Sequence, residues 1–194
     1  MTRGVEVDEV EQLLQGLLAT TDPYAQPFRA DVANRVILAL VLGHFAPMQF
    51  EAIGAAASSL SEDSCFVAVA GIGGEVEDHW PKRRLSDVER IRFDDYEGYW
   101  ESALSDTNLL LSTSGRWVIL NAEVDDFALA GGDAAFVRHL VAVYPAWPPG
   151  AEESTPIEDQ GELFARNSGV WESLTASVLT HVQEAPYVFP GRPR

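Results

Sequence analysis

The feature that most constrains the fold is a pair of apolar segments joined by a tight turn near the middle of the chain. Asn108 to Ser112 and Arg116 to Asn121 flank the turn Thr113-Ser114-Gly115. Side chains of the second segment alternate between two sets, as in a strand, and a short glycine-containing turn joins antiparallel strands. The pattern predicts a β-hairpin, and Phe127 to Ala130 predicts a third strand after the acidic turn 123–126.

Helical periodicity occurs on both sides of this meander. From about Asp8 to Ala19 and from about Ala134 to Tyr144, apolar residues recur at the spacing of an amphipathic helix. Asp133 is a good N-cap for the second of these helices. Asp8 followed by Glu11 resembles a capping box at the start of the first.

Two further helices are predicted between residues 29 and 60. Arg29 to Phe45 is apolar nearly all round, which favours a buried central helix closed at its C-terminal end by His44. A strand over Val36 to Leu42 is the alternative, because short apolar runs fit both periods. Pro47 to Leu60 begins with a proline in its first turn, where helices tolerate it.

The remaining segments complete the set of predicted elements. Ser64 to Ala70 predicts a buried strand, and Leu85 to Phe93 contains another. Residues 145–160 predict a loop, Ser168 to Gln183 a final helix, and residues 190–194 a frayed tail.

Helices followed by strands and then by helices indicate the α+β class, since βα units do not alternate along the chain. We therefore predict a single domain over residues 1–194. Its antiparallel sheet would have about four to six strands, flanked by N-terminal, central and C-terminal helices.

Charge and cysteine content exclude several functions. The chain has 13 basic and 30 acidic residues among 194, a net charge of −17, whereas nucleic-acid binding needs a basic face. A lone cysteine, Cys65, excludes a disulfide framework and a cysteine-rich zinc site. It opens an apolar strand and is predicted to be buried and unreactive.

The sequence also predicts a compartment. The first nine residues contain one basic residue followed by acids, without the apolar run of a secretory signal. The longest apolar run, Val36 to Leu42, is far shorter than the ~20 residues that span a bilayer. We expect a cytoplasmic protein that does not enter the membrane.

The densest set of possible metal ligands is Glu75, Glu77, Asp78 and His79. Carboxylates with an imidazole bind Mg²⁺, Mn²⁺ or Zn²⁺. Their spacing matches no metal motif, and adjacent residues rarely point to one centre, so a solvated acidic loop is the favoured interpretation. No cofactor is predicted, and a metal-dependent hydrolase that uses these residues stays as an alternative function.

The best candidate for a binding surface is the segment from Asp94 to Glu101, which combines acidic and aromatic side chains. Tryptophan and tyrosine anchor protein interfaces, and acidic groups steer a basic partner. The alternative is that the aromatic side chains face the core and only the acids contact water. The residues predicted to bind a partner are Asp94, Asp95, Tyr96, Glu97, Tyr99, Trp100 and Glu101.

A basic cluster precedes this segment. It holds five of the 13 basic residues of the chain, and in a chain of net charge −17 it is expected to pair with the protein's own acids. Its members are Lys82, Arg83, Arg84, Arg90 and Arg92.

Residues 108–144 combine the hairpin, Gly131-Gly132 and a helix with Phe136 and Leu140. This segment resembles small acidic bacterial proteins, including immunity proteins of polymorphic toxin systems. The resemblance implies an inhibitor without enzymatic activity that blocks the active site of a toxin. A basic toxin would be the natural partner of an acidic inhibitor.

These observations favour a binding protein over an enzyme. Enzymes need convergent polar groups, and none occur here at a convincing spacing. We expect an acidic cytoplasmic protein-binding module, most concretely an immunity-type inhibitor of a basic partner protein. The alternatives are the metal-dependent hydrolase and a self-associating structural or phage-related protein.

Overall fold

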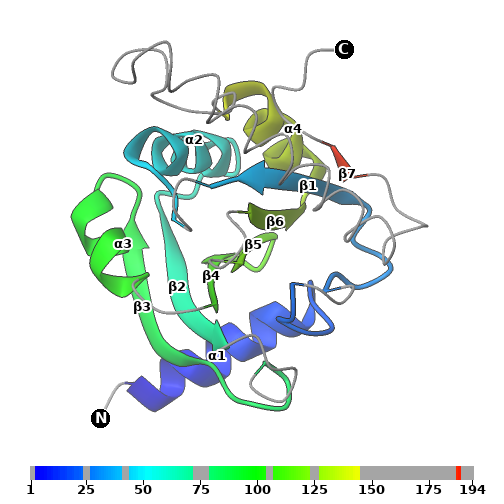
Figure 1. Ribbon diagram of the computed structural model, residues 1–194, viewed down its shortest axis with the longest axis vertical. Coiled ribbons are helices and arrows are strands. Elements are labelled where there is room, and N and C mark those ends of the chain that lie inside the picture. The colour runs from blue at the N-terminus through cyan, green and yellow to red at the C-terminus, as the bar shows by residue number, and fades with distance from the viewer. Residues whose placement is uncertain are drawn as a thin grey trace, which may run out of the picture.

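A seven-stranded sheet forms the centre of the computed structural model (Figure 1). The structure describes residues 3–23, 27–40, 44–71, 79–103, 107–122, 127–144 and 187–188. The strands are β1 (Asn34–Ala39), β2 (Ser64–Gly71), β3 (Ser86–Arg92), β4 (Thr107–Ser112), β5 (Trp117–Ala122), β6 (Phe127–Gly132) and β7 (Tyr187–Val188).

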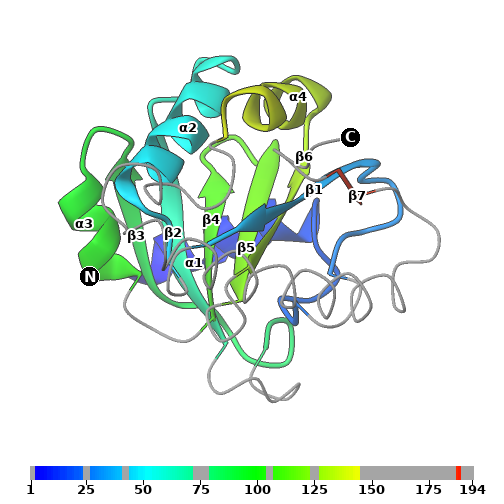
Figure 2. The same cartoon turned by 45° about the horizontal axis from the view of Figure 1, so that its top comes forward.

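Strands β1 to β6 form an antiparallel sheet in the order β3-β2-β4-β5-β6-β1. The short β7 extends the β1 edge in parallel orientation. The described helices are α1 (Arg3–Gln15), α2 (Pro47–Ser58), α3 (Tyr96–Ser102) and α4 (Ala134–Val143). Figure 2 shows α1 across one face of the sheet and α2 and α4 across the other. The predicted α+β class is confirmed, with the described residues in one domain.

Because helices cover both faces of the sheet, its side chains enter two separate cores. On β4, Leu109 and Leu111 point toward α1, whereas Leu110 points toward α2. The first core contains Val10, Leu14, Phe66, Leu109, Leu111, Val118, Leu120 and Leu129. The second contains Val36, Leu38, Phe50, Ile53, Cys65, Val67, Leu110, Trp117, Ile119, Phe136 and Leu140.

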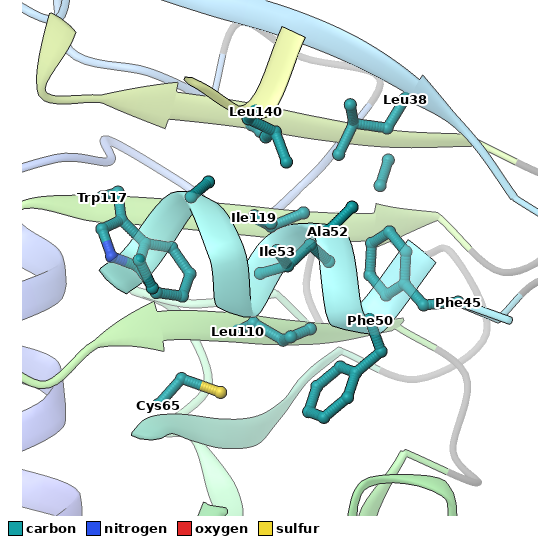
Figure 3. Close-up of a cluster of buried hydrophobic side chains, with 14 of the residues drawn as sticks. Leu38, Phe45, Phe50, Ala52, Ile53, Cys65, Leu110, Trp117, Ile119 and Leu140 are labelled. Atoms are coloured by element: carbon teal, nitrogen blue, oxygen red, sulfur yellow. The ribbon is translucent and has the colours of Figure 1, made fainter. Parts of the chain in front are cut away.

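The second core runs the length of α2. Figure 3 shows Phe45 and Phe50 at one end of this helix and Trp117 at the other. Trp117 stacks on Phe136 of α4, with ring centroids 4.5 Å apart and planes inclined by 6°. Aromatic contacts of this kind add to the free energy of burial, so they help to fasten α4 to the sheet.

The helix predicted over Arg29 to Phe45 is wrong, and the alternative, a strand, is correct in type, although it spans Asn34–Ala39 and residues 41–43 lie outside the described part. Val36 and Leu38, two residues apart, enter the same core, which is the period of a strand. Apolar residues at every position satisfy helical and strand periods alike, so pairing with β6 decided the conformation. His44 therefore closes no helix and is buried instead.

Arg35 of β1 ties the strand to the loop that precedes it. Its buried guanidinium donates from Nε to the carbonyl of Val32 at 2.6 Å and from Nη2 to that of Arg29 at 2.8 Å. The charged group also lies over the ring of Phe28, 5.5 Å from its centroid. Two charge-assisted hydrogen bonds and this cation–π contact stabilise the entry to the strand.

Helix α1 begins at Arg3, so the predicted capping box of Asp8 and Glu11 is wrong. Both residues lie inside the helix, where their carboxylates bind Arg84. Arg92 likewise binds Asp63 and Asp94. The expected pairing of the basic cluster with the protein's own acids is confirmed for these two arginines.

The other predicted elements are found close to their expected bounds, and Asp133 caps α4 by accepting the N–H of Ala135 at 2.7 Å. The predicted loop 145–160, the helix Ser168 to Gln183 and the tail 190–194 lie outside the described residues. Within the described part of the chain, no helix combines the length and apolarity that crossing a membrane requires.

Gly132 is expected to be indispensable at the end of β6. Its φ is +140°, and an added Cβ would lie 2.3 Å from the carbonyl oxygen of Arg116 and 2.6 Å from Cα of Trp117. Gly132→Ala should lower the free energy of unfolding by about 3 kcal/mol or more, through backbone strain and overlap. Denaturant unfolding measures this loss.

Gly16→Ala is the matched control, since its Cβ would meet only the Leu13 carbonyl at 3.4 Å. Its free energy of unfolding should change by less than about 1 kcal/mol. Equal losses in the two variants would contradict the described conformation of Gly132.

Candidate protein-binding site

The predicted acidic and aromatic residues lie on α3 and the turn before it, beside the outer strand β3 (Figure 1). Asp95 is the N-cap, and its carboxylate accepts the N–H of Gly98 at 2.9 Å. A Cβ at Gly98 would lie 2.5 Å from that carboxylate. Aspartate and glycine at these positions therefore permit the helix to begin at Tyr96.

Tyr99 faces the core, which corrects its predicted role as a partner-binding anchor. Its side chain is fully buried, and its ring stacks on Phe50 with centroids 4.5 Å apart. Its hydroxyl accepts the N–H of Phe45 at 3.3 Å. Tyr99 therefore fastens α3 to the start of α2.

Tyr96 is partly buried and makes a second link to the same backbone. Its hydroxyl donates to the carbonyl of Phe45 at 3.0 Å, so the two tyrosines hold both polar groups of that residue. Desolvation raises the pKa of Tyr96 above its ordinary value, and the phenol stays a neutral donor at neutral pH. Only part of this ring is available to a partner.

Trp100 is the exposed aromatic side chain of α3, with 42% of its surface accessible. Its indole packs against the buried ring of His44 in an edge-on arrangement, with centroids 4.9 Å apart. The contact restricts the orientation of the indole while leaving much of it open to solvent. A restricted, half-exposed tryptophan is suited to anchoring a protein partner.

The four acids of the segment differ in what they bind. Asp94 accepts two hydrogen bonds from Arg92, at 2.9 and 3.1 Å, and these lower the pKa of the carboxyl group. Asp95 is occupied as the N-cap. Glu97 and Glu101 are exposed one turn apart and form no ion pair with any described residue.

A buried carboxylate that sequence analysis did not single out lies at the other end of α2. Glu62 accepts hydrogen bonds from Ser112 Oγ at 2.6 Å, Ser114 Oγ at 2.5 Å and Trp117 Nε1 at 2.7 Å. All three donors are neutral, and they belong to the β4–β5 hairpin. We assign Glu62 a structural role, because its hydrogen bonds tie the residues after α2 to this hairpin.

The proposed metal ligands are not brought together among the described residues. Glu75, Glu77 and Asp78 lie outside them, and the described part of the chain contains no group of three or more potential ligands. His79 is buried against Gly71, where a Cβ would lie 2.4 Å from its Nδ1. The interpretation of a solvated loop is therefore wrong for His79.

Two exposed apolar side chains lie outside the predicted segment. Met48 on α2 is 58% accessible and Val143 on α4 is 39% accessible. Helical periodicity alone could have identified both residues as exposed, since neither lies on the buried face of its own helix. Periodicity could not have shown how the two helices pack against each other.

Comparison with known proteins returned no matching family model, no matching characterised protein and no matching solved structure.

Removing the Glu62 carboxylate should destabilise the protein. Glu62→Ala leaves the buried Trp117 Nε1 without its acceptor, whereas the Ser112 and Ser114 hydroxyls can still bond to each other, so the free energy of unfolding should fall by about 1–3 kcal/mol. Asp63→Ala, at an exposed neighbouring carboxylate, should cost at most about 1 kcal/mol. Chemical denaturation of both variants checks this, and equal losses would exclude the structural role.

Cys65 should be inert in the folded protein. Burial, and secondarily the negative charge of Glu62, raise the pKa of its thiol far above the ordinary value. Labelling by a thiol reagent should proceed only as fast as the protein opens, even at alkaline pH. Fast stoichiometric labelling without denaturant would contradict the burial of Cys65.

Proposed function

We propose that this protein is a binding module that inhibits a basic partner protein through α3. One observation carries the proposal: Glu97 and Glu101, which form no ion pair with any described residue, lie on the same short helix as the half-exposed indole of Trp100. The indole supplies apolar contact area, and the acids attract positive charge. The net charge of −17 extends this attraction over a longer range.

The surface is held in place before a partner arrives. Tyr96 and Tyr99 tie α3 to the backbone of Phe45, and Asp95 caps its start. A rigid surface loses little conformational entropy on association. This favours tight inhibition over weak, transient contact.

The position of Glu101 supports a role in binding, because it does not favour the helix itself. Glu101 lies near the C-terminal end of α3, where the helix dipole disfavours an acid and no basic residue is present in the last turn. It is also four residues from Glu97, a like-charged spacing that destabilises helices. Attraction to a basic partner would offset both effects.

The resemblance of residues 108–144 to immunity proteins favours a toxin as the partner. An inhibitor of this type would act in the cytoplasm, where it would cover the basic active site of a toxin such as a nuclease. The strand and helix elements that carry the resemblance form the centre of the sheet and α4. The binding residues lie on α3, outside that segment.

Reversing the charge of the α3 acids should slow association. Partners captured from native host lysate on wild-type protein would be identified, and their association rates measured at low and high salt. We expect Glu97→Lys with Glu101→Lys to reduce the low-salt association rate by about tenfold or more, with little effect at high salt.

The matched control reverses two exposed acids outside α3, Glu9→Lys in α1 with Asp31→Lys in the loop before β1. This variant has the same net charge as the α3 variant, so it separates the local surface from overall charge. Equal slowing in both variants would exclude α3 as the binding surface. The absence of any salt-sensitive basic partner would exclude the proposed function.

A further inference from the structure

The large exposed apolar side chains of the described residues lie on three different helices. Each is next in sequence to a buried residue, and these buried residues lie where the three helices meet. The exposed side chains are Met48 on α2, Trp100 on α3 and Val143 on α4. The buried neighbours are Gln49, Tyr99 and Tyr144, respectively.

Tyr99 and Tyr144 belong to the same buried cluster, and Gln49 contacts Tyr144. The side chain of Gln49 accepts the N–H of Ala46 at 2.8 Å and is hydrogen-bonded to Tyr144. Burial first, and then the proximity of Tyr99, raise the pKa of Tyr144 well above its ordinary value. Tyr99 accepts the N–H of Phe45. The start of α2, the end of α4 and the middle of α3 consequently meet at one corner of the helical layer.

The charged side chains of α2 and α3 are all acidic. Glu51 is exposed one turn after Met48, and Glu97 and Glu101 flank Trp100. Helices α2 and α3 contain no lysine or arginine, and the last turn of α4 contains no basic residue. Exposed apolar and acidic side chains therefore occur on the helices that meet at this corner.

We propose that Met48, Trp100 and Val143, rimmed by Glu51, Glu97 and Glu101, bind an amphipathic basic segment of the partner protein. Apolar side chains of that segment would cover the three exposed residues, and its lysines or arginines would pair with the rim. This inference rests on the proposed function and extends its site from α3 to α2 and α4.

Charge selects this occupant over others. A second copy of the chain would bring another acidic rim against the first, and like charges facing each other disfavour self-association. An anionic membrane surface would be repelled for the same reason. A basic amphipathic segment satisfies both the apolar patch and its rim.

The test uses two synthetic peptides, each about five helical turns long. One places leucine at i, i+3, i+4 and i+7 and lysine elsewhere, and the other replaces every leucine with glutamine. Binding of both to the full chain would be measured by calorimetry. Wild-type protein should bind the leucine–lysine peptide at least about tenfold more tightly than the glutamine–lysine peptide.

Met48→Gln with Val143→Gln should remove this preference and leave the weak binding of the glutamine–lysine peptide unchanged. Both side chains are exposed, so the melting temperature should not fall, and thermal unfolding verifies this. Ala134→Gln, at an exposed position at the opposite end of α4, is the matched control and should retain the preference.

The outcomes distinguish this inference from the proposed function. If the double variant keeps the leucine preference while Glu97→Lys with Glu101→Lys weakens both peptides, the inference is overturned and the acidic α3 surface stands. If neither peptide binds, or if no variant alters binding, both are overturned. If sedimentation shows a wild-type oligomer that Met48→Gln with Val143→Gln dissociates, the patch joins copies of this chain and the inference is overturned.

Discussion

Burial of both faces of the β4–β5 hairpin is the constraint on which the rest of the structure depends. Leu109 and Leu111 require α1 on one side, and Leu110 and Ile119 require α2 and α4 on the other. An antiparallel sheet more often leaves one face to solvent, with polar residues alternating along its strands. Here the central strands are apolar on both sides, so helices before and after the hairpin must pack over it.

The second core determines which charges remain available at the surface. Helix α3 is attached through Tyr96 and Tyr99, by stacking and by hydrogen bonds to backbone groups. Ion pairs are used elsewhere, where Arg84 and Arg92 bind acids of α1 and of the turns that flank β2 and α3. Aromatic contacts and backbone hydrogen bonds hold α3, whereas Glu97 and Glu101 form no ion pair within the described part of the chain.

The two ends of α2 have different tasks. Beyond its C-terminal end, the Glu62 carboxylate accepts hydrogen bonds from neutral donors of the β4–β5 hairpin. These bonds fix this end of the helix against the sheet. At its N-terminal end, Phe45 and Gln49 join α3 and α4, leaving Met48 exposed. One end is therefore stabilised by a buried polar network, whereas the other supports a surface suited to binding.

The sequence by itself determined the elements whose signals are local: the hairpin, the strands β2 and β3, the helix α2, and α4 with its Asp133 cap. Periodicity, turn residues and capping act over a few residues, so they can be interpreted without the rest of the chain. Likewise, the acidic character of the α3 segment is a local property, and the exposure of Trp100, Glu97 and Glu101 agrees with it. Only the tertiary structure decided that Val36 and Leu38 lie in a strand, because the partner strand β6 is about ninety residues away. It alone decided that Tyr99 is buried and that Glu62 is bound by Trp117, since side chains distant in sequence make those contacts.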